Sequence, residues 1–135
     1  MQTTKKIWIN GCFDVLHRGH IELFEYCKEV AGPDSNIRVG IDSDERVKQL
    51  KGQSRPINNQ RDRKYFLESI KFIDEVVVFN DELELINSIK KYSPDIMIVG
   101  SDYTNKRVIG SEHAKKLVFF DKIKGYSSTG ILEKI

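Results

Sequence analysis

The sequence predicts a single α/β domain, built as a doubly wound sheet of about five parallel strands with helices on both faces. Short apolar runs alternate with segments of helical periodicity along the chain, which is the pattern of strands joined by helical crossovers. Two of the runs, at residues 75–79 and 96–99, are dense in apolar and β-branched side chains, as in strands covered on both faces. A length of 135 residues suits one core, so we expect residues 1–135 to form one domain.

A glycine-punctuated turn at residues 11–20 separates the first strand from the first helix. The apolar run at residues 7–9 precedes the turn, and helical spacing after it predicts a helix over residues 19–30. His17 and His20 therefore lie at a helix N-terminus, where backbone N–H groups and the helix dipole favour an anion such as phosphate. Their imidazoles add donors that are charged or neutral near neutral pH.

The middle of the chain predicts a strand, a short helix, a loop and a longer helix. Residues 37–41 alternate in polarity as a strand does, and a short helical turn follows around Glu45. Residues 49–56 are polar, basic and interrupted by Gly and Pro, so we expect a loop. Asn58 or Asn59 can cap the next helix, whose charged face we place at residues 61–64. Its apolar positions are Tyr65, Phe66, Ile70 and Ile73.

The second half repeats the alternation. After the strand at residues 75–79, Asn80 or Asp81 can cap a helix that precedes the strand at residues 96–99. A short helix is expected from Gly110, then a last strand at residues 117–120. Ser127, Ser128 and Thr129 are placed to cap a C-terminal helix. Ligands of parallel sheets bind at the carboxyl ends of the strands, and four polar turns are expected there: residues 11–20, 49–56, 100–103 and 125–129.

Composition limits the class of protein. A formal net charge of +2 gives no basis for a nucleic-acid or membrane partner. Cys12 and Cys27 form no C-x-x-C pair, and no apolar run resembles a signal sequence or a membrane span. We therefore expect a cytoplasmic protein without a disulfide framework.

The histidine pair has other interpretations when taken alone. The dinucleotide and P-loop glycine patterns are absent, so any phosphate site is built differently. His17 and His20 could bind zinc, although a catalytic zinc needs a third protein ligand and His113 lies in a separate segment. They could also be two ordinary surface histidines at a helix start.

Residues 11–20, Gly-Cys-Phe-Asp-Val-Leu-His-Arg-Gly-His, resemble the G-x-F-D-x-x-H-x-G-H signature of the cytidylyltransferase-like nucleotidyltransferases, a Rossmann-like family. The resemblance continues in order through residues 40–44, 50–56, 100–103 and 125–129. It looks closest to adenylyltransferase domains that act on heptose 1-phosphate, and next to glycerol-3-phosphate cytidylyltransferase. Two departures weaken the second branch: Tyr103 replaces its tryptophan, and Lys122 matches an arginine that could bind phosphate through a planar fork.

The resemblance implies attack by an acceptor phosphate on the α-phosphorus of ATP or CTP, with release of pyrophosphate. It implies Mg²⁺ bound mainly through the phosphates, with Asp14 as the protein contributor, and a homodimer, for which apolar residues near Trp8 and Phe120 offer support. The implied catalytic residues are His17, His20, Lys51 and Arg63, with Lys48 as a weaker candidate. The implied nucleotide-binding residues are Gly11, Cys12, Phe13, Asp14, Gly19, Gly100, Asp102, Tyr103, Ser127, Ser128 and Thr129.

Several of these residues have simpler interpretations that the sequence leaves open. Phe13 fits core packing under the turn better than a ligand contact. Asp14 fits a side-chain bond within the turn as well as it fits a phosphate or metal role. Lys48 fits an exposed helix charge, residues 127–129 fit a helix cap alone, and Asp102 fits a turn. The base and the acceptor stay open, as does a nucleotide-binding module that has lost catalysis.

Overall fold

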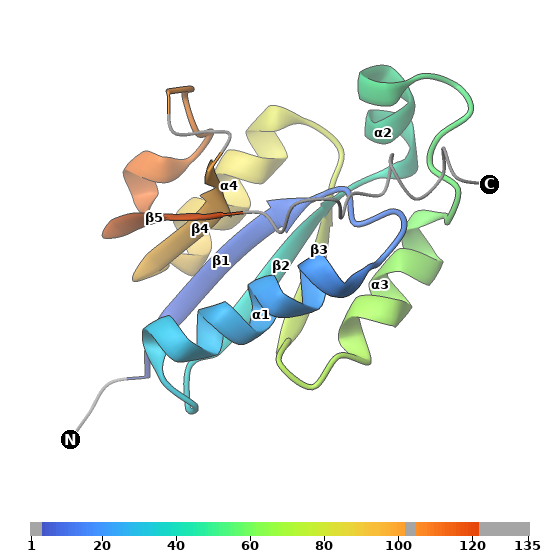
Figure 1. The fold of residues 1–135 in the computed structure, drawn as a ribbon. Helices are drawn as coiled ribbons and strands as arrows, with labels where there is room; N and C mark the ends of the chain where they lie inside the picture. The colour runs from blue at the N-terminus through green and yellow to red at the C-terminus, as the bar shows by residue number, and fades with distance from the viewer. Residues whose placement is uncertain (1–3, 102–104, 122–135) are drawn as a thin grey trace.

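The computed structural model describes residues 4–101 and 105–121, which form an all-parallel, five-stranded sheet with the strand order β3-β2-β1-β4-β5 (Figure 1). The predicted α/β class and the number of strands are confirmed. The strands are β1 (Lys6–Gly11), β2 (Asn36–Asp42), β3 (Glu75–Phe79), β4 (Ile96–Gly100) and β5 (Lys116–Phe120). The helices are α1 (Arg18–Ala31), α2 (Asp44–Lys51), α3 (Gln60–Glu68) and α4 (Glu82–Tyr92), with a short 3₁₀ helix at Ser111–His113.

Two apolar clusters cover the two faces of the sheet. On one face, α1 and α3 contribute Phe24, Cys27 and Leu67 to a core shared with β1, β2 and β4. On the other face, α4 packs Leu85 and Ile89 against Trp8 and other residues of the sheet. Figure 1 shows α1 in front of the sheet and α4 behind it. The prediction of helices on both faces is therefore confirmed.

The strand order reverses between β1 and β4, and these two strands pair over a short length. Their register joins Ile7 to Ile96 and Trp8 to Met97, whereas β1 and β2 pair from Lys6 through Gly11. The carboxyl-terminal halves of β1 and β4 are thus not joined by a ladder. In doubly wound sheets a ligand binds at this reversal, outside the carboxyl ends of the strands. The turn that follows β1 lies at that position.

Two predicted boundaries are wrong. Helix α2 continues to Lys51, so the loop begins at Gly52, which has a φ of 100° and donates its N–H to the Lys48 carbonyl. Glycine adopts this conformation without the steric cost that other residues meet. Helix α3 ends at Glu68 and does not reach Ile73; Ser69 is its C-cap and donates both its hydroxyl and its N–H to the Tyr65 carbonyl.

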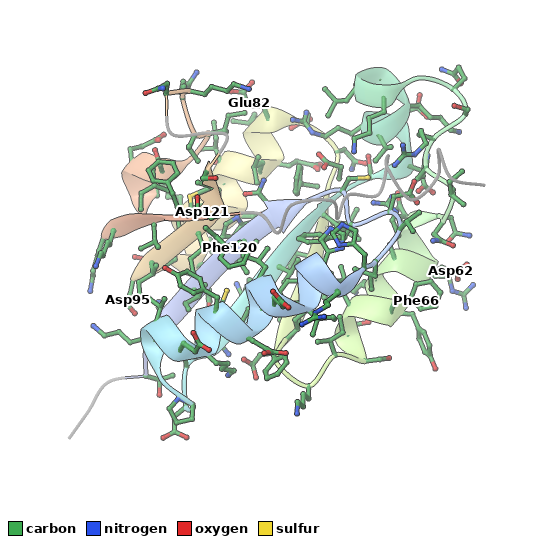
Figure 2. The ribbon with its side chains drawn as sticks, in the orientation of Figure 1. Asp62, Phe66, Glu82, Asp95, Phe120 and Asp121 are labelled. Carbon is green, nitrogen blue, oxygen red and sulfur yellow. The ribbon has the colours of Figure 1, made fainter. Side chains whose placement is uncertain are left out.

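The predicted orientation of α3 is also wrong. Tyr65 and Phe66, assigned to an inward apolar face, are 69% and 43% exposed, whereas Arg63 is fully buried. Figure 2 shows Asp62 and Phe66 directed away from the sheet. The predicted C-terminal helix lies outside the described residues. Within residues 4–101 and 105–121, no helix combines the length and apolarity that crossing a bilayer requires.

Candidate nucleotide site at the start of α1

The turn from β1 into α1 places an aromatic side chain beneath the two histidines. Phe13 adopts a φ of 50°, a conformation uncommon for residues other than glycine, and its ring is buried. The ring lies 5.6 Å from the Phe24 ring and 5.1 Å from the His20 ring, measured between centroids. The interpretation of Phe13 as core packing is confirmed. The Phe13 ring therefore lies between the core residue Phe24 and the ring of His20, and it anchors the turn to the core.

His17 and His20 form the N-terminal cap of α1 with each other. The N–H of Gly19 donates to Nδ1 of His17 at 3.1 Å, and the N–H of His17 donates to Nδ1 of His20 at 3.2 Å. The two rings stack with centroids 3.9 Å apart. This is a capping box in which imidazole nitrogens replace the usual side-chain oxygens.

The capping bonds determine the tautomer of both rings. A nitrogen that accepts a hydrogen bond carries no proton, so the proton of each neutral imidazole lies on Nε2. Each ring thus holds the helix start with Nδ1 and carries its donor on Nε2. This division suits recognition of an anion, because the donating nitrogen is fixed by the fold before any ligand arrives.

The charges around the α1 start favour an anion as well. The first turn of α1 contains no acidic residue and begins with Arg18. Negative charge is stabilised at the N-terminus of a helix by the dipole and the backbone N–H groups. The zinc alternative finds no support in the described ranges, where no group of three or more His, Cys, Asp or Glu is arranged to hold a metal.

Asp14 is an anchor for the loop between α2 and α3. Its side chain is 2% exposed. Oδ2 accepts from Arg55 Nε at 2.9 Å and from the Ile57 N–H at 2.8 Å, while Oδ1 accepts from the Asn58 N–H at 2.8 Å. Burial by itself would raise the pKa of the Asp14 carboxyl, but the bonds from Asn58, Ile57 and Arg55 outweigh it and lower the pKa.

The structural interpretation of Asp14 therefore fits better than the metal one. Both carboxylate oxygens already accept hydrogen bonds from the 55–58 segment, and the Asn58 amide donates to the Asp14 carbonyl at 2.7 Å. A Mg²⁺ ion would have to compete with these donors. A metal role for Asp14 stays a prediction, and the hydrogen bonds favour its role as an anchor of the loop.

Arg63 differs most from the role that the resemblance implies. Its guanidinium is fully buried and donates to the carbonyls of Cys12, Asp42 and Asn58 at 2.8–2.9 Å. It also pairs with Asp44 Oδ1 at 2.8 Å. Because these bonds occupy the fork, Arg63 in this structure joins β1, β2 and the α3 start rather than reaching outward to a phosphate.

Lys51 is exposed at the end of α2, and its charge acts on the turn after β1. Burial raises the pKa of the Cys12 thiol, and the positive charges of Lys51 and Arg63 oppose that rise. The ammonium of Lys51 is therefore close enough to the turn to affect its electrostatics. Lys48, one turn earlier, is half-buried.

The remaining predicted site residues divide into two groups. Gly11 ends β1, Gly19 lies in the first turn of α1, and Gly100 ends β4, all at the carboxyl edge of the sheet. Asp102, Tyr103, Ser127, Ser128 and Thr129 lie outside the described residues. The 11–20 turn and the 49–56 loop are brought together by the bond between Asp14 and Arg55. Gly100 lies at the same edge of the sheet, because it ends β4.

Sequence analysis missed Arg55 and Asn58, which bind Asp14. Both lie more than 40 positions from Asp14 in the chain, so no local pattern links them to it. The only signal for Arg55 was its place in the segment at residues 50–56 that belongs to the family resemblance, whereas Asn58 was considered as a helix cap.

A separate hollow of about 370 Å³ runs along the outer side of α1 next to β5. Phe120, labelled in Figure 2, contacts Tyr26 there at 5.1 Å between centroids. The hollow is lined by the carboxylates of Glu22, Glu25 and Glu29, among others, and these charges repel phosphate. The start of α1 is therefore the better anion site.

The doubly wound sheet, with the predicted anion site at the start of α1, fits one class of protein: an α/β nucleotide-binding domain. The sequence model of the cytidylyltransferase-like family matches residues 8–133, and the chain belongs to this family of nucleotidyltransferases.

Similar proteins give the same family and the same fold. The chain is 43% identical to the bifunctional protein HldE of Campylobacter fetus subsp. fetus (strain 82-40), over 96% of this chain and 27% of that protein. It is also 43% identical to HldE of Helicobacter pylori (strain P12), over 97% of this chain and 28% of that protein. The chain thus spans little more than a quarter of the curated relatives it matches. The crystal structure of the lipopolysaccharide core biosynthesis protein from Thermoplasma volcanium GSS1 has a TM-score of 0.71 and 20% identity, covering 90% of this chain and all of that one, and shares the fold.

Proposed function

We propose that the chain transfers an adenylyl group from ATP to the phosphate of D-glycero-D-manno-heptose 1-phosphate and releases pyrophosphate. The observation that carries the proposal is the histidine cap of α1, in which Nδ1 of each ring is used by the helix and Nε2 carries the donor. The choice of adenylyl and heptose is supported by the resemblance in the 50–56 and 100–103 segments and by the similarity to HldE.

The reaction forms a bond between an acceptor phosphate oxygen and the α-phosphorus, and breaks the bond from that phosphorus to the bridging oxygen of pyrophosphate. No protein nucleophile is needed, so the protein acts by positioning two anions and stabilising charge. In this proposal Nε2–H of His17 and His20 donates to phosphate oxygens as charge builds on the leaving group. Lys51 adds a cation from the end of α2, and Gly19 lets the backbone approach closely.

Magnesium is part of the proposal through the substrate. Mg²⁺ commonly binds a few carboxylates at most and takes its other ligands from phosphates and water. This mode of binding needs no cluster of three metal-binding side chains, and the described residues contain none. When bound, the ion would neutralise phosphate charge, while the histidines and Lys51 orient the same phosphates.

A homodimer and a cytoplasmic location are further parts of the proposal. Trp8 gives no support for a dimer, because it is fully buried in the α4-side core, whereas Phe120 is half-buried and packs on Tyr26. The described residues instead expose Leu50, Ile57, Tyr65 and Phe66 around α2 and α3. Light scattering of the purified chain measures the oligomeric state directly.

Pyrophosphate release with Mg²⁺ tests the activity. ATP and CTP are each paired with the heptose 1-phosphate and with glycerol 3-phosphate, and His17→Ala is the control. Turnover with ATP and the heptose phosphate, lost in the control, is the expected result. Turnover only with CTP and glycerol 3-phosphate would assign the chain to the second branch that the sequence resembles. Nucleotide binding without turnover in any pairing would indicate a binding module.

A further inference from the structure

Arg55 is held in an unusual way at the turn after β1. Its Nε donates to Asp14 Oδ2 at 2.9 Å, and its side chain is 12% exposed. Its Nη2 is buried and has no hydrogen-bond partner among residues 4–101 and 105–121. A buried guanidinium N–H without a partner loses its hydration without replacement, so its presence needs an explanation.

The explanation begins with the crowding of Asp14. A guanidinium facing a carboxylate commonly makes two parallel hydrogen bonds. Here the Asn58 N–H occupies Oδ1, while the Ile57 N–H shares Oδ2 with Arg55. The ion pair of Arg55 and Asp14 is thus made through one nitrogen only. The backbone N–H groups of Ile57 and Asn58 thus share the two carboxylate oxygens with Arg55.

The position of Arg55 in the chain connects this pair to Lys51. Lys51 ends α2, Gly52 stops the helix, and the N–H of Arg55 returns to the Gly52 carbonyl at 3.2 Å. Only one tight turn therefore separates the end of α2 from the residue fastened to Asp14. Among the residues of the loop that bind Asp14, Arg55 lies nearest in the chain to the end of α2.

We propose that Arg55 is a positioning residue: its single bond to Asp14 holds the loop at residues 52–58 in place and so places Lys51 opposite the His17–His20 end of α1. The inference rests on the proposed function, in which Lys51 acts on the substrate phosphates. Arg55 itself acts through Lys51 and is not assigned a contact with substrate.

The one-nitrogen geometry makes a prediction that distinguishes this role. Arginine and lysine are not interchangeable where the fork is used, but here only Nε is engaged. A lysine can supply one charged donor to Asp14 and removes the unpaired Nη2. Arg55→Lys should therefore keep most of the activity, whereas Arg55→Met should not.

The test is a double-mutant cycle on the full chain, measuring kcat and KM for pyrophosphate release. Arg55→Met is expected to lower kcat/KM about tenfold, within the usual range for coupled neighbours, and to have almost no further effect when Lys51→Met is already present. Arg55→Lys should stay within about threefold of the unchanged chain. Arg61→Met, which removes an exposed arginine from α3, is the matched control and should have no effect.

Two outcomes overturn the inference. In the first, Arg55→Met leaves kcat/KM as unchanged as Arg61→Met does. In the second, adding Arg55→Met to Lys51→Met lowers kcat/KM by the same factor as Arg55→Met alone. Circular dichroism melting of Arg55→Lys and Arg55→Met separates these outcomes from unfolding. If the unchanged chain turns over no substrate pair, the proposed function fails separately. In that case the affinity for inorganic pyrophosphate is measured for the same set of variants. The expected coupling between Arg55 and Lys51, and the two results that would overturn it, are unchanged.

Discussion

The starts of α1 and α3 both lie at the carboxyl edge of the sheet, yet their chemistry is opposite. At α3, Asn59 caps the helix with a side-chain oxygen at 2.8 Å from the Asp62 N–H, and Asp62 places an acid in the first turn. At α1, an imidazole replaces the oxygen and the first turn has no acid. Helices α2 and α4 follow the α3 pattern, with Ser43 and Asp81 as caps and acidic residues in their first turns.

In the proposed function, this difference separates helix starts that carry their own negative charge from one that receives it from a ligand. An acid in the first turn stabilises the positive end of the helix dipole. Helices α2, α3 and α4 supply that charge themselves, whereas α1 among the four described α-helices does not. The missing negative charge at α1 is the charge that a phosphate brings.

The basic residues of the two regions differ in the same way. Arg63 at α3 directs its guanidinium inward to backbone carbonyls and Asp44, while Lys51 is exposed at the end of α2. Basic residues near the proposed phosphate site are thus of two kinds, which are distinguished by their burial and their hydrogen-bond partners. Each kind predicts a different response to substitution.

The largest expected effect is on stability, at α3. Arg63→Met removes the donors of three buried carbonyls and leaves Asp44 without its partner, so we expect a loss of about 3–5 kcal/mol in the free energy of unfolding. Urea unfolding followed by circular dichroism measures it. Arg61→Met, on the exposed side of the same helix, is expected to change the free energy by less than about 0.5 kcal/mol.

The same variant decides between the two roles of Arg63. If it keeps the stability of the unchanged chain and loses only turnover, then Arg63 contacts substrate as the family resemblance implies. That result would make the α3 start part of the catalytic site and remove the contrast with α1.

The next effect is on activity, at α1. His17→Asp restores an ordinary oxygen cap and adds the acid that the other helices have, so the free energy of unfolding should stay equal or rise by up to about 1 kcal/mol. Pyrophosphate release should fall by about 10²–10³-fold, because a donor to the phosphates is replaced by a negative charge. Stability and kcat/KM are measured on the same preparation.

Asn59→Ala is the counterpart at α3. Removing this cap should lower the free energy of unfolding by about 1 kcal/mol and leave kcat/KM nearly unchanged. If His17→Asp retained activity, the α1 start would be an ordinary helix cap and the phosphate site would have to lie elsewhere.

The fold was predictable because strands and helices carry local patterns, and the motif at residues 11–20 located the turn. The inward direction of Arg63 was not predictable. Tyr65 and Phe66 have the spacing of an inward apolar face, although both are exposed, and the carbonyls that Arg63 binds lie in three separate segments. The role of Asp14 was open for the same reason. Periodicity ranks residues by polarity, but a buried guanidinium satisfied by distant carbonyls has no periodic signature.

Asp14 joins the two regions, and its substitution is expected to lower the free energy of unfolding by less than Arg63→Met does. Asp14→Asn replaces one carboxylate oxygen with an amide that cannot accept, so at least one donor among Arg55, Ile57 and Asn58 loses its acceptor. We expect a loss of about 1–3 kcal/mol at pH 7. Chemical unfolding of both proteins at several pH values measures it.

The pH dependence has a defined sign. The pKa of Asp14 is lower in the folded chain than its ordinary value of 3.8, so the unfolded chain takes up the proton first as pH falls. The stabilisation is complete above about pH 5 and disappears as pH falls through the folded pKa, below 3.8. The gap between the unchanged chain and Asp14→Asn should therefore be constant near neutrality and shrink in acid. If the difference in the free energy of unfolding did not depend on pH, and Asp14→Asn changed the Mg²⁺ requirement for turnover, then Asp14 would be a metal ligand. Arg63 alone would then connect the two helix starts.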